Sequence, residues 1–241
     1  MAAHLVFVLW GCWLWLLWGT GLVLRGGRFN RQRERDRLLR GVSRYLALLR
    51  RWGLLESEFT GFGDAVSWKG TLVVANHPSI LDALLLMTVV PSLEFLINAQ
   101  LINHPVMGGA MRLSGFLRND APLGMIRSGT KTLSAGSNLL VFPEGTRTKS
   151  PPLDSFHHGH ALVAIRSGAP VRTVFITCDS DYFGRRFCFF KPGPSPVRYR
   201  ITAGRSFEVS GGDDPRALSA EIEHYMRDVL RKSATTCQAT V

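Results

Sequence analysis

From about residue 56 onward, short apolar segments alternate with segments of helical periodicity. Four segments rich in Val, Ile, Leu and Phe are typical of buried strands: residues 71–75, 93–98, 138–141 and 171–178. Helical patterns lie between and after them, at residues 78–90, 121–136, 157–168 and 214–234. This alternation predicts an α/β domain with a mixed, largely parallel sheet flanked by helices. We expect one domain over residues 56–234 and a disordered tail over residues 235–241.

The amino-terminal segment is apolar enough to enter a membrane. Residues 5–24 form a run of 20 residues without a charge, which is long enough to cross a bilayer core as a helix. A cleaved signal peptide is the alternative, but no basic start and no small-residue cleavage site are present. We therefore predict a retained anchor over residues 1–24. Its cationic flank follows it, which places the rest of the chain in the cytosol.

The segment after this anchor, residues 25–55, holds most of the positive charge. The chain has a net charge of +11, and ten Arg and two acids between residues 25 and 51 account for +8 of it. Apolar residues recur among these arginines at helical spacing: Leu38, Val42, Tyr45, Leu46, Leu49 and Trp52. The pattern predicts either an interfacial helix with its apolar face in the lipid or a helix that packs this face on the domain. The neighbouring anchor favours the interfacial position.

Composition excludes several classes of protein. Apolar residues make up 46% of the chain, which excludes a disordered protein. The four Cys are scattered without CxxC spacing, so we expect free thiols and neither a disulfide framework nor a zinc site. Because the basic excess lies beside the apolar run and not across the domain, nucleic acid is not expected as a partner.

The sequence VANHPSILD follows the first expected strand of the domain. A helix that begins at Pro78 would place His77 at its cap and Asp82 in its second turn. The Asp82 carboxylate could then reach one imidazole nitrogen and leave the other free to accept a proton, as in a general base with an orienting acid. Alternatively, Asn76 or His77 only caps the helix and Asp82 is solvated.

A second polar cluster, FPEGTR, follows the expected strand at residues 138–141. Arg147 suits a phosphate because its planar guanidinium can bind two oxygens, and Glu144 could hold a substrate hydroxyl or brace Arg147. The alternative is a tight turn with a surface ion pair. Ligand sites in open α/β sheets form at the carboxyl ends of strands, so the two clusters could share one site.

Together, Asn76-His77 with Asp82 and the block Phe142 to Arg147 resemble the glycerolipid (lysophosphatidic acid type) acyltransferase superfamily. The resemblance implies an αβ acyltransferase domain after an amino-terminal helical membrane anchor, in a divergent, bacterial-looking lysophospholipid branch. It also implies that His77 is the general base and that Asp82 orients it. The residues implied to bind the acceptor substrate are Asn76, Arg118, Glu144, Gly145, Thr146 and Arg147.

The resemblance further implies an O-acyltransferase that moves an acyl chain from a thioester to the hydroxyl of a lysophospholipid, such as 1-acylglycerol 3-phosphate. The expected partners are a lipid bilayer, this acceptor, and acyl-carrier protein or acyl-CoA as the donor, with no cofactor. The expected location is a bacterial inner membrane, with the catalytic domain on its cytoplasmic side. A lipid or thioester hydrolase, an acyltransferase for a non-glycerol lipid, and a catalytically silent lipid-binding protein remain alternatives.

Three nearby histidines, His157, His158 and His160, raise the possibility of a metal site. They lack defined acidic or Cys partners, so the start of a helix is the preferred interpretation and no metal is expected. The resemblance places His157 or His158 beside the acceptor.

Overall fold

The computed structural model describes residues 31–97, 117–118, 122–180, 184 and 196–238. The anchor predicted over residues 1–24 lies outside these residues. Of the helices that are described, none is both long and apolar enough to cross a membrane.

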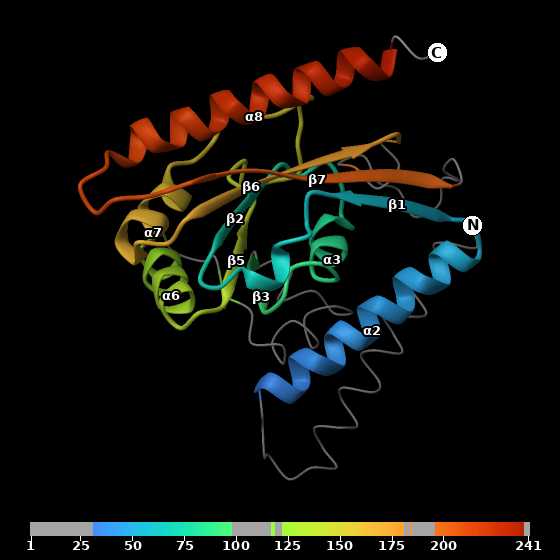
Figure 1. Ribbon diagram of the computed structural model, residues 1–241, viewed down its shortest axis with the longest axis horizontal. Helices are drawn as coiled ribbons and strands as arrows, with labels where there is room; N and C mark the ends of the chain where they lie inside the picture. The colour runs from blue at the N-terminus through green and yellow to red at the C-terminus, as the bar shows by residue number, and fades with distance from the viewer. Residues whose placement is uncertain (1–30, 98–116, 119–121, 181–183, 185–195, 239–241) are drawn as a thin grey trace.

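A single seven-stranded sheet organises the molecule (Figure 1). The strands are β1 (Leu55–Thr60), β2 (Leu72–Ala75), β3 (Leu93–Ile97), β4 (Leu117–Arg118), β5 (Asn138–Val141), β6 (Val171–Cys178) and β7 (Val197–Phe207). Their order is β1-β7-β6-β2-β5-β3-β4. The five strands from β6 to β4 pair in parallel, whereas β7 is antiparallel to β6 and parallel to β1. The prediction of a mixed, largely parallel α/β sheet is therefore confirmed.

Helices cover both faces of the sheet. They are α2 (Arg31–Arg51), α3 (Asp82–Leu86), α6 (Pro122–Ser134), α7 (Gly159–Ser167) and α8 (Pro215–Gln238), with a short 3₁₀ turn, η1 (Ala65–Ser67). Because side chains alternate along a strand, β2 sends Val73 and Ala75 into a core with α2 and α3. It sends Leu72 and Val74 into a second core with α6, α7 and α8.

The apolar stripe of α2 packs on the domain and not in lipid. Its members Leu38, Val42, Tyr45, Leu46 and Leu49 are all at most 4% exposed. They share a core with the apolar side chains of β1 and β7, whose sheet face would otherwise contact water. The predicted interfacial orientation, with this face in the membrane, is therefore wrong. Only Trp52, just past the helix, is half exposed.

The prediction of a disordered tail over residues 235–241 is wrong for residues 235–238, and residues 239–241 lie outside the described residues. Helix α8 continues to Gln238, so residues 235–238 are helical where we expected disorder from residue 235. The helix begins as the sequence predicts, with Pro215 in its first turn and Asp214 Oδ2 accepting the Ala217 N–H at 2.9 Å.

Candidate active site

Two polar connections meet at one edge of the sheet. Strands β2 and β5 are parallel neighbours, so the segments that follow them, residues 76–81 and 142–148, leave the sheet at the same edge. The Thr148 N–H donates to the His77 carbonyl at 2.9 Å and joins the two segments directly. The structure thus brings together the two clusters that are 67 residues apart in sequence.

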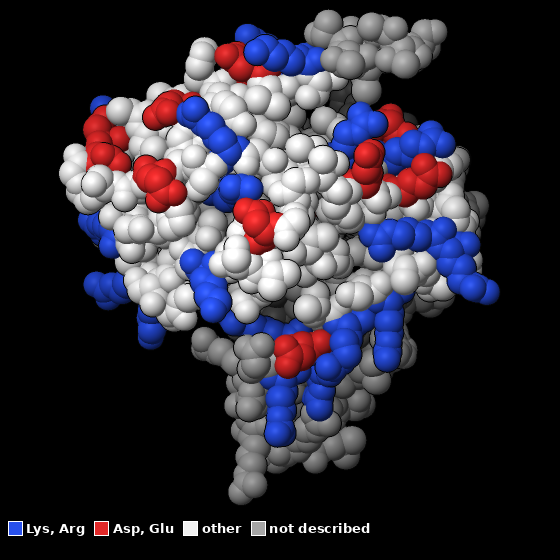
Figure 2. Space-filling view, in the orientation of Figure 1, with Lys and Arg blue, Asp and Glu red and all other residues white. Residues whose placement is uncertain are grey.

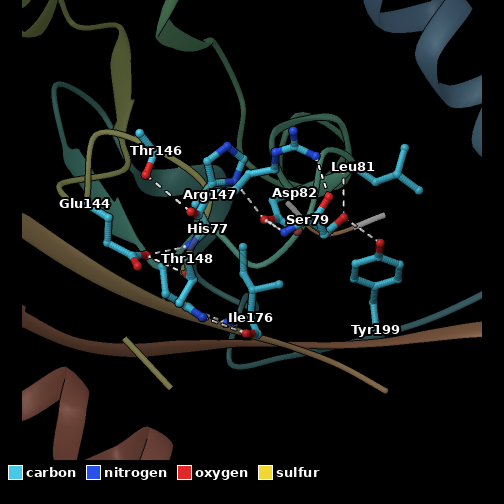
Figure 3. Close-up of polar contacts among 12 residues, drawn as sticks. His77, Ser79, Leu81, Asp82, Glu144, Thr146, Arg147, Thr148, Ile176 and Tyr199 are labelled. Atoms are coloured by element: carbon cyan, nitrogen blue, oxygen red, sulfur yellow. Dashed lines mark hydrogen bonds and ion pairs between the residues drawn. The ribbon is translucent and has the colours of Figure 1, made fainter. Parts of the chain in front are cut away.

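A His-Asp pair lies in the first connection (Figure 3). His77 Nδ1 is 2.9 Å from Asp82 Oδ2. The His77 side chain is 21% exposed, whereas that of Asp82 is fully buried. A carboxylate here favours the tautomer that carries its proton on Nδ1, which leaves Nε2 as the proton acceptor.

Burial and hydrogen bonds shift the pKa of Asp82 in opposite directions. Burial raises the pKa of its carboxyl, while the hydrogen bond and charge of His77 and the N–H of Ser79 lower it. The Ser79 N–H donates to Asp82 Oδ2 at 2.8 Å, so one carboxylate oxygen receives both Ser79 and His77.

The orientation of the imidazole is also fixed by an aromatic ring. His77 stacks on Phe142, with ring centroids 3.9 Å apart and ring planes inclined by 11°. Phe142 precedes Pro143 in the second connection, so one cluster supports the catalytic candidate of the other. Phe142 belongs to the FPEGTR block, but no local pattern predicts that its ring stacks on His77.

The helix after the first cluster begins later than predicted. We expected Pro78 as the first helical residue, but α3 begins at Asp82. The turn before it is held by local side chains: Ser79 Oγ accepts the Leu81 N–H, and Asp82 accepts that of Ser79. Such side-chain bonds compete with helical ones and delay the helix. The pair still forms because Asp82 reaches back across this turn.

Glu144 is turned into the protein and bonded to protein donors. The residue is only 5% exposed. Oε1 accepts the His77 N–H at 2.9 Å and the Thr148 hydroxyl at 3.0 Å, and Oε2 accepts the Asp154 N–H at 3.0 Å. Burial raises the pKa of Glu144, and these three donors oppose the rise. In this position Glu144 holds the backbone of His77, and its contact with the acceptor stays a prediction.

Asn76 is likewise a structural residue in this arrangement. It is 2% exposed, and its amide forms two hydrogen bonds of 2.8 Å with the backbone N–H and C=O of Ile176 on β6. The side chain thus continues the pairing of β2 with β6 beyond the end of β2. A contact of this amide with substrate, as expected from the sequence, would require both bonds to break.

The remaining residues of the second cluster lie nearer to solvent. Gly145 has φ 72°, a left-handed conformation that favours glycine, and a Cβ there would lie 3.1 Å from His157 Cδ2. Gly145 and Thr146 are exposed, and Arg147 is half-buried with its guanidinium donating to the Gly184 carbonyl. The turn therefore leaves Thr146 exposed and Arg147 partly exposed, while Glu144 is buried; Figure 3 shows the three side chains around His77.

The three histidines do not form a metal centre. His160 is buried, its Nδ1 donates to the His157 carbonyl at 2.8 Å, and burial lowers its pKa to about 4. His157 and His158 are exposed. Across the described part of the chain, no group of three or more His, Cys, Asp or Glu is placed to bind a metal ion.

Arg118 lies in the short strand β4, and the position of its side chain lies outside what the structure describes. Sequence reasoning missed Ser79, Thr148 and Tyr199, which support the pair. Ser79 and Thr148 lie within or beside the two motifs. Tyr199 lies 120 residues from Ser79, its hydrogen-bond partner, and no local pattern identifies it.

The chain is similar in sequence to known acyltransferases. A family model described as Acyltransferase matches residues 59–177. Mouse 1-acyl-sn-glycerol-3-phosphate acyltransferase alpha is 27% identical over 171 residues, which are 68% of this chain and 60% of that protein. Lyso-ornithine lipid O-acyltransferase of Pseudomonas aeruginosa is 35% identical over 114 residues, 46% of this chain and 44% of that protein.

A solved structure shares the fold. The crystal structure of the 1-acyl-sn-glycerophosphate acyltransferase PlsC from Thermotoga maritima matches with a TM-score of 0.68 and 19% identity, over 95% of this chain and 96% of that one. The family model and the sequence relatives show that the chain belongs to the glycerolipid acyltransferase superfamily. The chain spans 60% of the mouse relative's length and 29% of that of a chloroplast relative from Arabidopsis thaliana.

Proposed function

We propose that the protein is an O-acyltransferase that moves an acyl chain from a thioester to the hydroxyl of a lysophospholipid. One observation carries the proposal: a partly exposed His77 is bonded through Nδ1 to a fully buried Asp82. Such a pair leaves Nε2 facing a reactant as a general base. Membership of the acyltransferase superfamily supports the choice of reaction.

In the proposed reaction, Nε2 of His77 takes the proton from the acceptor hydroxyl as its oxygen attacks the thioester carbonyl carbon. The carbonyl π electrons move to oxygen and form a tetrahedral oxyanion. When this intermediate collapses, the C–S bond breaks, the thiolate leaves, and the proton on Nε2 passes to the sulfur. The acceptor itself is the nucleophile, so no protein residue becomes acylated. Asp82 stabilises the imidazolium that forms between the two proton transfers.

For the acceptor we propose a lysophospholipid with a phosphate, such as 1-acylglycerol 3-phosphate. The partial exposure of Arg147 and the exposure of Thr146, in a connection that is bonded to His77 through Thr148, support this choice, because a guanidinium and a hydroxyl suit a phosphate. Several relatives are named for 1-acyl-sn-glycerol-3-phosphate. The Pseudomonas relative, named for lyso-ornithine lipid, supports an aminolipid acceptor as the second candidate. The donor is acyl-carrier protein or acyl-CoA.

We also propose that the protein works at a membrane, on the cytoplasmic side of a bacterial inner membrane. The apolar run at residues 5–24 supports an anchor. The outer face of α2 supports an electrostatic contact, because arginine side chains gather along it (Figure 2). The arginines Arg40, Arg44 and Arg51 are exposed there, and each arginine near an anionic surface contributes about 1 kcal/mol of attraction.

The test uses membranes from cells that express the full chain, with a labelled acyl thioester and a panel of lysolipids. We expect acceptor-dependent transfer by the wild type, and a loss of about 10³-fold in kcat for His77→Ala. His224→Ala, which changes an exposed histidine on α8, is the matched control and should retain full activity. Thioester cleavage without a lysolipid would indicate the hydrolase instead, and full activity of His77→Ala would exclude the proposed base.

Arg147→Ala separates the two acceptor candidates. For a phosphate-bearing acceptor we expect KM to rise at least about tenfold, because a charged hydrogen bond contributes about 1.5–3 kcal/mol. Arg216→Ala, at an exposed arginine of α8, is the control. An unchanged KM for the phosphate acceptor would contradict the phosphate role of Arg147.

A further inference from the structure

A buried pair of hydroxyl groups lies behind the His77–Asp82 pair. Ser79 Oγ and the Tyr199 hydroxyl are 2.6 Å apart, and these residues are 1% and 2% exposed. Tyr199 belongs to β7, whereas Ser79 belongs to the turn between β2 and α3. The bond therefore fixes the turn to a strand that is not a neighbour of β2 in the sheet.

Ser79 connects this bond to the carboxylate through its own backbone. Its N–H donates to Asp82 Oδ2 at 2.8 Å, and its Oγ accepts the Leu81 N–H at 3.0 Å. The position of Ser79 consequently determines the turn before α3. It also places one of the two donors to Asp82 Oδ2, the oxygen that is bonded to His77. Figure 3 shows Tyr199, Ser79 and Asp82 following one another toward His77.

The hydroxyl of Tyr199 is not needed to fill the core. Its ring lies among apolar side chains of the core that α2 covers, where a phenylalanine would pack as well. A buried hydroxyl costs free energy unless it is hydrogen-bonded, and here the bond goes to Ser79. Cys178, its register partner on β6, also lies beside it. Burial raises the pKa of Tyr199 and that of Cys178, the latter to about 11, so both groups are neutral at physiological pH.

We infer that Tyr199 is a positioning residue for the catalytic pair, acting through Ser79 on the Asp82 carboxylate. It completes a set of three supports for the segment after β2, each from a different strand or its extension. Asn76 is bound to Ile176 of β6, the His77 N–H to Glu144 after β5, and Ser79 to Tyr199 of β7. The inference rests on the proposed function, since it assumes that His77 and Asp82 carry the reaction.

The test compares Tyr199→Phe, Ser79→Ala and the double variant in the full-length, membrane-bound protein. We expect Tyr199→Phe to lower kcat about tenfold, because small displacements of a catalytic group have large effects on rate. KM for the acceptor should stay within about twofold of the wild-type value, since Tyr199 lies behind the pair and not in contact with substrate. The double variant should be no slower than Ser79→Ala alone, because both changes remove the same bond.

Tyr225→Phe is the matched control, because it removes a tyrosine hydroxyl that accepts the Arg205 N–H away from the pair. It should leave kcat unchanged. The inference is overturned if Tyr199→Phe retains wild-type kcat, if its effect lies in KM, if the two single effects multiply in the double variant, or if a loss of folded protein accounts for the lost activity. If the wild type and His77→Ala have equal activity, the proposed function has failed instead.

Discussion

The connection after β2 and the connection after β5 make an informative comparison. Both leave the same edge of the sheet, and the sequence places expected substrate-binding residues in both: Asn76 in the first, and Glu144, Gly145, Thr146 and Arg147 in the second. In the first, His77 reaches solvent while Asn76 and Asp82 are buried. In the second, Thr146 is exposed while Glu144 is buried. Each segment therefore contains exposed residues that a substrate could reach and buried residues that hold the backbone.

The two connections depend on each other, but in different ways. The first carries the His77–Asp82 pair, and the second supports it through the Phe142 ring, the Glu144 carboxylate and the Thr148 N–H. A polar residue within a motif can thus hold the backbone of another motif. Substitutions of the exposed residues and of the buried residues should therefore have different effects on activity and stability.

The largest effect is expected for Asp82→Asn. Asparagine keeps the size of the side chain but removes the charge that stabilises the imidazolium, and it favours the wrong imidazole tautomer. We expect kcat to fall by about 10³-fold or more, measured by transfer at saturating acceptor. Asp228→Asn, at a partly exposed acid of α8, is the control. Activity within threefold of the wild type would show that Asp82 is not the orienting acid.

The second-largest effect is expected for Glu144→Gln. The new amide N–H₂ must face the N–H of His77 or that of Asp154, so one buried donor loses its partner. The displaced His77 backbone should lower kcat by up to about 10²-fold. Glu221→Gln, at an exposed acid on α8, controls for the loss of a carboxylate. A rise in acceptor KM alone would restore Glu144 to the substrate-binding residues.

The raised pKa of Glu144 also predicts that the stability difference between the wild type and Glu144→Gln depends on pH. Burial raises the folded-state pKa of Glu144, so the folded protein binds more protons than the unfolded chain. The contribution of this group to the free energy of unfolding is therefore complete below the unfolded-state pKa of about 4.3. It is lost as the pH rises through the higher pKa of the folded state. We expect the Tm advantage of the wild type over Glu144→Gln to be largest in acid and to shrink with rising pH. An advantage that grows with pH would contradict the raised pKa.

Asn76→Ala tests the other inward-facing residue. Removing its amide leaves the N–H and C=O of Ile176 unpaired in a buried place, so we expect the free energy of unfolding to fall by about 1–3 kcal/mol. Denaturant unfolding measures the change, and Asn76→Asp should also destabilise by burying an unpaired charge. Unchanged stability with a raised acceptor KM would favour the substrate contact expected from the sequence.

The smallest effect is expected for Thr146→Ala. Its hydroxyl is exposed, and its bond to the Arg147 carbonyl is long, at 3.3 Å. Stability should change by less than about 0.5 kcal/mol. KM for a phosphate-bearing acceptor should rise about three- to fivefold, as for one neutral hydrogen bond. A substantial fall in Tm would place Thr146 with the inward-facing residues and remove the contrast within its segment.

The sequence predicted the strands well because their apolar runs are local signals. The expected segments at residues 71–75, 138–141 and 171–178 match β2, β5 and β6 closely. Strand β1 was not predicted, because the alternating sequence LESEFT at Leu55–Thr60 buries only its first residue fully. Its place at the sheet edge depends on pairing with β7, about 140 residues later.

The orientation of α2 could not be read from its sequence. The same stripe of Leu, Val and Tyr would suit lipid or a protein core, since both remove apolar surface from water. The choice depended on whether another part of the chain offered an apolar surface of matching size. The face of the sheet near β1 and β7 does so, and α2 covers it.

The sequence by itself predicted the strand-helix alternation, the two polar clusters at strand ends and, through the family resemblance, the pairing of His77 with Asp82. These follow from local periodicity and from motifs whose residue types carry their own chemistry. Tertiary structure alone decided which polar side chains face a reactant and which face the protein. Asn76, Glu144 and Ser79 are turned inward because their partners Ile176, His77 and Tyr199 come from other parts of the fold, and an inward polar group is stable only where such partners satisfy it.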